Sequence, residues 1–287
     1  MREKPRKRSQ FQMTWRRYKK SKLAILGLAA VAVLFFSALI IPLFKDYDTA
    51  VEQDFSSRYQ PLSAEHIFGT DQFGRDIFIR MMFGARISLL VGIATVSASL
   101  LSGSCIGAVA GYYGGRIDEV LMRIMDVFLA IPNTLLAISI VAALGQGITN
   151  LLIALAISQV PSFARVVRAS ILTVKEQDYI EAARALGTPS ARIIARHILP
   201  NAIGPIIVQT TLNVARTILN ISSLSFVGLG ISPPTPEWGS MLADAKPQML
   251  QYPHLILIPG AAIAITVMAI NLVGDGLRDA LDPRLRN

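Results

Sequence analysis

One apolar stretch in the last third of the chain carries a row of polar side chains at helical spacing. At about 100° per residue, four of them fall within an arc of roughly 60°, namely Gln209, Asn213, Arg216 and Asn220. We call this row the polar stripe. An arginine in the middle of a membrane-length helix is costly against lipid, so the stripe must face protein or a watery cavity. Arg216 would bind a carboxylate or backbone carbonyls of a ligand there, or pair with an acid of a partner chain.

Residue types that support catalysis or metal binding are too scattered to predict a site of either kind. The three histidines lie far apart in the sequence, at positions 66, 197 and 254. Cys105 is the single cysteine, so an intrachain disulfide or a thiol pair for a metal is not possible. Gly274-Asp275-Gly276 matches only a fragment of the G-x-G-D motif of intramembrane aspartic proteases. We therefore expect no catalytic residue, no metal site and no cofactor held by this chain.

The helices that position the polar stripe belong to a very apolar chain. Of its 287 residues, 52% are hydrophobic and 16% are charged, and the mean hydropathy is +0.48. That composition excludes an ordinary soluble globular protein and indicates several membrane spans. We predict an all-α polytopic membrane protein with six transmembrane helices, at 23–44 and at about 85–111, 119–143, 151–172, 202–227 and 254–273.

The segments between the predicted spans complete the domain organisation. It consists of a basic tail (1–22), a first span (23–44), an extracytoplasmic loop (45–83), a five-helix core (84–274) with a loop at 176–200 and an outer loop at 228–253, and a tail (275–287). With the N-terminus inside, most lysines and arginines fall on the cytoplasmic side, which predicts that both termini are cytoplasmic. The net charge of +9 is then a signal of topology. We expect contact with membrane lipid rather than nucleic acid.

Two spans carry patterns that predict how they pack or bend. The second has a ridge of glycines four residues apart, which lets helix backbones approach closely in lipid: Gly103, Gly107 and Gly111. The third begins with Glu119, Arg123 and Asp126, which are spaced to pair along one helix face. Pro132-Asn133 is expected to kink that third span.

Residues 178–200 interrupt the membrane pattern and predict two short helices separated by Gly187-Thr188-Pro189. Gly187 is suited to the left-handed conformation that closes a first helix. Thr188 is suited to cap a second helix, with Pro189 as its first residue. The first helix offers a surface of small side chains and the second a pair of arginines one turn apart: Ala182, Ala183 and Ala185, then Arg192 and Arg196.

This segment resembles the EAA loop of ABC-importer permeases. Glu181-Ala182-Ala183, Gly187 and Leu199-Pro200 stand at the family's spacing, whereas His197 replaces the isoleucine of the generic pattern. In that family the loop is the coupling helix that docks into a groove on an ATPase subunit. The resemblance therefore implies an ATPase contact through Glu181, Ala182, Ala183, Gly187, Arg192 and Arg196. The alternative is an ordinary amphipathic loop between two spans.

Two outer segments resemble dipeptide, oligopeptide and nickel permeases. One is H-I-F-G-T-D-Q-F-G-R-D at 66–76, and the other is L-S-F-V-G-L-G at 224–230 followed by P-P-T-P-E-W-G at 233–239. The turn and cap residues of the first favour a structural role over substrate contact. The second is either a surface for a substrate-binding protein or a structural cap. Relatives often have an acid where Ile221 stands, and its absence removes one candidate partner of Arg216.

The resemblance implies a type I importer in the cytoplasmic (inner) membrane of a bacterium or archaeon. Its partners would be a second homologous permease, two ATP-binding subunits that hold ATP and magnesium, and an extracytoplasmic substrate-binding protein. The implied substrate is a di- or oligopeptide, with a nickel chelate as the alternative. A secondary transporter or channel would also explain six spans and an intramembrane arginine, but it would not explain the EAA spacing.

Overall fold

The computed structural model describes residues 10–281, and this part of the chain is helical, with a single isolated bridge between Thr70 and Asp76. The helices are α1 (Gln10–Tyr18), α2 (Lys22–Phe44), α3 (Asp48–Val51), α4 (Ile77–Tyr113), α5 (Gly115–Leu129), α6 (Asn133–Leu144), α7 (Ile148–Lys175), α8 (Asp178–Ala185), α9 (Ser190–Ile193), α10 (Leu199–Phe226), α11 (Trp238–Ala245) and α12 (His254–Leu281). The 3-10 turns η1 (Phe55–Ser57) and η3 (Lys246–Gln248) and the π-helical segment η2 (Ile194–Ile198) complete the list. The expected all-α polytopic class is confirmed.

Five helical stretches are long and apolar enough to cross a membrane, and a sixth span exists if α5 and α6 count as one. The prediction of a continuous, merely kinked helix at 119–143 is wrong, because α5 and α6 meet at 84°. Pro132 has an extended backbone with ψ of 131°, and its ring nitrogen cannot donate to the preceding turn. The chain therefore breaks there and starts a new helix at Asn133.

Helices also extend into segments that we expected to be loops or tails. α4 begins inside the predicted loop 45–83, because the Asp76 carboxylate caps it by accepting the Ile79 N–H at 3.0 Å. α12 continues beyond the predicted end at 273 to Leu281, so Asp275 does not end it. The basic tail contains α1, and the outer loop 228–253 contains α11. Residues 1–9 and 282–287 of the predicted tails lie outside the described part.

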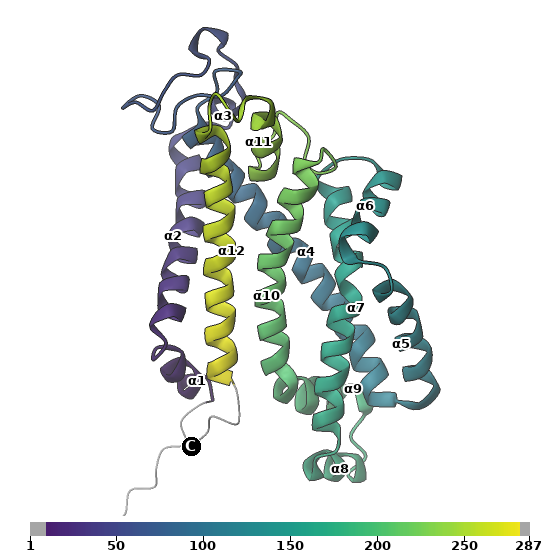
Figure 1. Cartoon of the computed structure of the whole chain (residues 1–287). Helices are drawn as coiled ribbons and strands as arrows, with labels where there is room; N and C mark the ends of the chain where they lie inside the picture. Colours follow the sequence, from purple (N-terminus) through teal and green to yellow (C-terminus); the bar gives the residue numbers. More distant parts are fainter. Residues whose placement is uncertain (1–9, 282–287) are drawn as a thin grey trace, which may run out of the picture.

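The membrane-length helices stand side by side, with α4 running obliquely behind α10 to pack along α7 (Figure 1). The predicted glycine ridge lies at that contact. A Cβ on Gly103 would lie 2.5 Å from the Phe163 Cβ, and one on Gly107 would strike the Ala164 carbonyl oxygen. A Cβ on Gly111 would lie 3.1 Å from the Arg168 carbonyl oxygen. The α4 and α7 backbones are therefore too close for a side chain at Gly103 and Gly107 without a shift of one helix, and the contact at Gly111 is tight.

The ion pairs of α5 differ from the predicted ones. Asp126 pairs with Arg165 of α7 at 2.6 Å, rather than with Arg123 along its own helix. Nearer the start of α5, the Asp118 carboxylate accepts hydrogen bonds from the Nε and NH2 groups of Arg168. Because α5 packs against α7, these acids meet the arginines of the neighbouring helix. The pairs hold α5 to α7.

Candidate functional site

The EAA loop stands at one end of the molecule, where α8 projects beyond the neighbouring helix ends (Figure 1). We call this end the α8 end and the opposite end, where α3 and α11 lie, the outer end. Three isoleucines anchor the loop and are fully buried: Ile180 of α8, Ile193 of α9 and Ile198 of η2. They pack in one cluster with Val167 and Ile171 of α7. The cluster therefore connects the loop to α7 and to the start of α10.

The turn after α8 has the predicted glycine geometry. Gly187 has a φ of +72°, its N–H donates to the Arg184 carbonyl at 2.9 Å, and the Thr188 N–H donates to the Ala183 carbonyl at 3.1 Å. The predicted start of the second helix is wrong by one residue. Pro189 keeps an extended backbone with ψ of 140° and occupies the cap position, so the helix starts at Ser190 and Thr188 lies outside it.

The surface of the loop is small and exposed. Of the residues predicted to contact an ATPase, Ala183 is half-buried. The others are exposed, namely Glu181, Ala182, Gly187, Arg192 and Arg196. Sequence reasoning missed Leu186, whose side chain is 85% exposed. The available signal was a large apolar residue beside the glycine of a segment with small and polar side chains. A Cβ on Gly187 would meet nothing within 4 Å, so the space beside Leu186 is open.

The polar stripe lies on α10 and divides between buried and open positions. Asn213 is 4% exposed, Gln209 and Asn220 are half-buried, and Arg216 is exposed. The Asn213 Nδ2 is buried without a hydrogen-bond acceptor in the described structure. No ion pair within residues 10–281 involves Arg216. This arginine is therefore available to a ligand or to an acid of another chain.

A buried polar contact joins the stripe to α7, which sequence reasoning also missed. The Gln159 Nε2 donates to the Thr217 Oγ1 at 3.0 Å, and that hydroxyl donates to the Asn213 carbonyl at 2.7 Å. Gln159 lies two residues before Pro161, inside α7. The hydrogen bonds fix the rotation of α10 against α7 and so determine which face presents Arg216.

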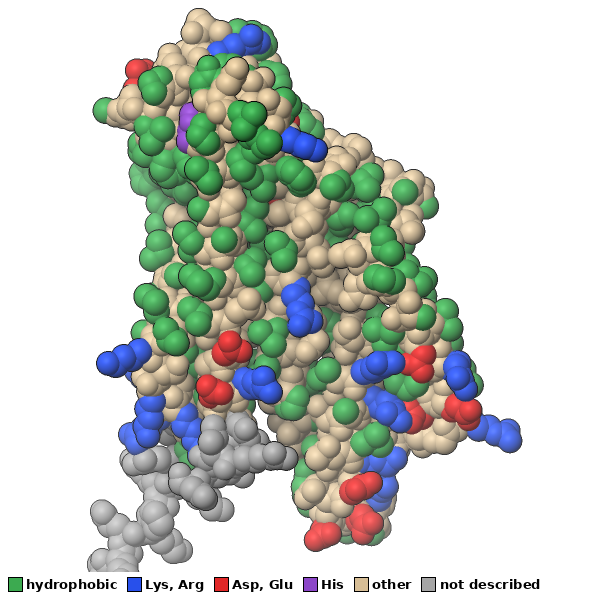
Figure 2. All heavy atoms as spheres, viewed as in Figure 1, with side chains coloured by type: hydrophobic (Ala, Val, Ile, Leu, Met, Phe, Trp, Pro, Cys, Tyr) green, Lys and Arg blue, Asp and Glu red, His purple; other side chains and the backbone are tan. Residues whose placement is uncertain are grey.

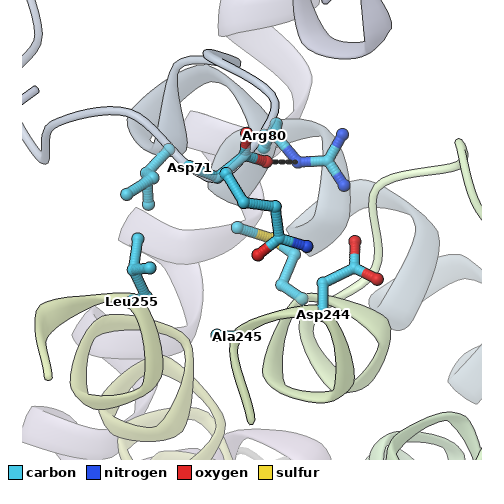
Figure 3. Close-up of a pocket in the computed structure, with 8 residues that line it drawn as sticks. Asp71, Arg80, Asp244, Ala245 and Leu255 are labelled. Atoms are coloured by element: carbon cyan, nitrogen blue, oxygen red, sulfur yellow. Dashed lines mark ion pairs between the residues drawn. The ribbon is translucent and has the colours of Figure 1, made fainter. Parts of the chain in front are cut away.

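The outer end contains a charged cluster with two buried arginines and two partly exposed acids. The Arg75 side chain is 2% exposed, and its Nε and NH2 lie 2.7 Å and 3.1 Å from carboxylate oxygens of Asp71 and Asp244. Arg80 is 1% exposed, donates to the Ala50 carbonyl at 2.8 Å and lies 3.6 Å from Asp71. Figure 3 shows Asp71, Arg80 and Asp244 around the same pocket. Its volume of about 20 Å³ has room for about one water.

Glu237 organises the second outer motif from inside the protein. It is fully buried and accepts the N–H groups of Gly239 and Ser240 at 2.8 and 2.9 Å, at the start of α11. The neighbouring Trp238 is also buried and donates its Nε1–H to the Met81 carbonyl at 3.0 Å. Sequence reasoning missed Glu237, Asp244 and Arg80 as network members. Asp244 and Arg80 contact Arg75 and Ala50, which are distant in the sequence. For Glu237, the position before a helix was the available signal in the sequence.

The remaining acids and histidines are of the residue types that bind metal ions. Within residues 10–281, no group of three or more histidine, cysteine, aspartate or glutamate side chains gathers in an arrangement suited to a metal ion. In the loop 45–83, hydrogen bonds from the Ser56 and Ser57 hydroxyls lower the pKa of the exposed Asp54. The described geometry is thus one of binding surfaces and structural ion pairs.

Comparison with known proteins agrees with this geometry. The chain is 47% identical over 279 residues to the dipeptide transport system permease protein DppC of Alkalihalophilus pseudofirmus, with 97% of this chain and 91% of the relative covered. It is 42% identical over 284 residues to the glutathione transport system permease protein GsiD of Pectobacterium atrosepticum, with 98% and 93% covered. Residues 9–61 match the N-terminal transmembrane domain of oligopeptide transport permease C.

A solved structure of the MetNI methionine ABC transporter, in inward-facing conformations, has the same fold. The TM-score is 0.58 at 18% sequence identity, with 71% of this chain and 96% of that chain covered. At this identity the likeness concerns the fold alone, and it confirms the expected type I permease fold. The family of binding-protein-dependent transport system inner membrane components matches residues 103–287. The chain belongs to this family, as the EAA spacing predicted.

Proposed function

We propose that this chain is the non-catalytic permease subunit of an ATP-driven importer of small peptides, and that α8 couples it to an ATPase. The observation that carries this proposal is the exposed Leu186–Gly187 turn on a loop that buried isoleucines attach to α7 and α10. The relatives described above are named for a dipeptide and for glutathione, itself a short peptide. A peptide is therefore favoured over a nickel chelate.

The assembly that fits this function has a second homologous permease, two ATPase subunits and an extracytoplasmic substrate-binding protein. ATP and magnesium would bind to the ATPase subunits, since this chain has no phosphate-binding loop. Closure of the ATPases would move α8. Through Ile180, Ile193 and Ile198, this movement would tilt α7 and α10 and alternate the access of the path. Interfaces and packed cores of this kind switch between discrete arrangements.

The α8 end faces the cytoplasm in this proposal. The described starts and ends of the chain, α1 and the end of α12, lie at the same end as α8 (Figure 1). Both termini would therefore be cytoplasmic in a bacterial or archaeal inner membrane, in agreement with the positive-inside rule. The charged cluster at the outer end would then support the surface that receives the binding protein.

The polar stripe would line the translocation path between the two permeases. Gln209, Asn213 and Asn220 offer amide groups to peptide bonds, and Arg216 offers a charge-assisted hydrogen bond to a carboxylate. That carboxylate belongs either to the peptide C-terminus or to an acid of the second permease. A peptide with an amidated C-terminus separates the two sources, as described in the Discussion.

The experiment that tests the coupling role compares two glycine variants. Gly187→Asp places a charge at the proposed ATPase contact, and we expect loss of dipeptide uptake and of ATPase co-purification, with normal insertion into the membrane. Gly145→Asp is the matched control, because Gly145 has a φ of +88° and its added Cβ would also meet nothing within 4 Å. Gly145 lies in the turn between α6 and α7, away from α8. Normal uptake and ATPase recruitment by Gly187→Asp would refute the proposed function.

A further inference from the structure

A groove of about 750 Å³ opens at the α8 end between α1, the first turns of α10 and the last turn of α12. Arg17 lies on the α1 wall and Arg278 on the α12 wall, and Pro205, Val208 and Gln209 come from α10. Figure 2 shows both basic and acidic side chains at this end of the molecule. The volume is within the range of small-molecule sites in proteins.

The charges in the groove are unbalanced. No acidic residue lines it, and no ion pair in the described part of the chain involves Arg17 or Arg278. Arg17 is half-buried, so its guanidinium is partly shielded from bulk water. Below the arginines, Val208 and Leu281 make the walls apolar. The groove thus combines two unpaired cations with a hydrocarbon surface.

Packing holds the two arginines in place. Tyr18, next to Arg17, is 3% exposed, and its hydroxyl donates to the Ala24 carbonyl at 3.0 Å. A Cβ on Gly276 would lie 3.0 Å from the Tyr18 ring, so α1 sits directly on α12. Burial raises the pKa of the Tyr18 hydroxyl. The Arg17 wall is therefore fixed relative to the Arg278 wall.

The groove lies at the depth where a bilayer changes from hydrocarbon to headgroups. α12 and α2 are both membrane-length, and they end and begin beside it at Leu281 and Lys22. On α1, Trp15 is 42% exposed and stacks on Tyr18, and the Lys19 ammonium lies 5.2 Å from its ring centroid. An exposed tryptophan beside a lysine is typical of residues that anchor a helix at the membrane interface.

We propose that this groove binds one anionic phospholipid, with Arg17 and Arg278 contacting its phosphate and with Val208 and Leu281 contacting its acyl chains. Arginine forks match phosphate oxygens in geometry and charge. Basic pockets between transmembrane helices on the cytoplasmic side are the kind of site that binds anionic headgroups. The lipid would hold α1 and α12 against α10. Gln209 belongs both to the groove and to the polar stripe, so the groove adjoins the proposed translocation path, but its two arginines lie outside the stripe.

The test is a titration of phosphatidylglycerol onto the delipidated transporter complex in detergent, with the adducts on this chain counted by native mass spectrometry. We expect one tightly bound phosphatidylglycerol and much weaker binding of phosphatidylcholine. In the double variant Arg17→Gln/Arg278→Gln, the affinity for phosphatidylglycerol should fall about 30-fold. Each arginine near an anionic headgroup contributes about fivefold to the affinity, and the two contributions multiply. Arg116→Gln/Arg123→Gln on α5 makes the same charge change outside the groove and should leave the affinity unchanged.

A second variant blocks the groove without changing its charge. A Cβ on Gly204 would lie 3.9 Å from the Leu281 Cβ, so Gly204→Leu is tolerated by the backbone and fills the groove with the rest of its side chain. It should abolish the tight adduct while the thermal midpoint in detergent is retained. Equal binding of both lipids, equal loss in the α5 control, or equally tight binding of inorganic phosphate would overturn the proposal. Displacement of the lipid by a dipeptide would also overturn it and would assign the groove to the transport path.

Discussion

Arginines at the outer end and on the polar stripe differ in burial and in pairing. At the outer end, Arg75 and Arg80 are 2% and 1% exposed, and both have carboxylate or carbonyl partners within the chain. On α10, Arg216 is exposed and has no ion-pair partner in the described structure. A buried charge without a partner destabilises the folded chain, whereas an exposed charge can remain unpaired and is accessible to another molecule. The comparison separates arginines that are paired within the chain from one that is open to another molecule.

The same contrast applies between the two outer motifs and the EAA loop. The sequence favoured a structural role for the outer motif at 66–76 and left the role of the outer motif at 224–239 open. The side chains that distinguish the outer motifs, such as Asp71 and Glu237, are turned inward and cap or pair with the backbone. The EAA loop instead turns Leu186 outward. Four variants, ordered by their expected effect on stability, test how far this contrast holds.

The largest effect is expected for Asp71→Ala. It removes the acceptor of the buried Arg75 Nε and of the Phe73 and Arg75 backbone N–H groups, and leaves Asp244 as the remaining carboxylate partner of the guanidinium. Loss of one partner of a buried pair costs about 3–5 kcal/mol. The thermal midpoint in detergent and the amount of chain in the membrane should both fall. Asp48→Ala removes the same charge from an exposed position and should melt as the wild type does. Equal stability of the two variants would show that the outer network does not contribute to the stability of the fold.

A smaller loss is expected for Gly107→Val, because its Cβ would strike the Ala164 carbonyl oxygen of α7. Overpacking of this kind costs about 1–3 kcal/mol. The thermal midpoint measures it. Gly260→Val on α12 is the control, since a Cβ there would meet nothing within 4 Å. If both variants melted alike, close approach of α4 and α7 would not contribute to stability.

Asp126→Asn should have a weaker effect still. The Asp126 and Arg165 side chains are 51% and 56% exposed, and exposed pairs are worth about 0–1 kcal/mol. A double-mutant cycle with Arg165→Gln measures the coupling directly. A coupling energy above about 2 kcal/mol would show that partial exposure does not weaken the pair, and the contrast with the outer end would then disappear.

Arg216→Gln should leave stability unchanged within about 0.5 kcal/mol, since the exposed side chain has no partner to lose. Dipeptide uptake should nevertheless fall about tenfold, as expected when a hydrogen bond to a charged group is removed. Arg216→Lys should restore much of the uptake. If the ligand is the peptide carboxylate, uptake of a C-terminally amidated peptide should not respond to the substitution. Full uptake by Arg216→Gln would remove Arg216 from the transport path.

Much of the fold was readable because it depends on local chemistry. Membrane-length apolar runs, the left-handed Gly187 and the glycine ridge follow from hydropathy, backbone sterics and spacing along one helix. The predictions were wrong where the structure depends on contacts between helices or on how the chain turns from one helix to the next. Asp126 was matched to Arg123 but pairs with Arg165 of α7. Pro132 was expected to bend a helix but separates two helices at 84°.

The amino-acid sequence by itself determined the family, the helical membrane class and the position of the EAA loop, because each depends on residue type and spacing over short distances. Only the tertiary structure decided which charged residues are structural and which are open to a partner. The sequence placed Arg75 in a loop and Arg216 inside a span, but it identified the partner of neither side chain. Arg75 meets Asp244 from 169 positions away, whereas packing of α10 on α7 leaves Arg216 exposed. Burial and long-range pairing arise only when distant helices come together.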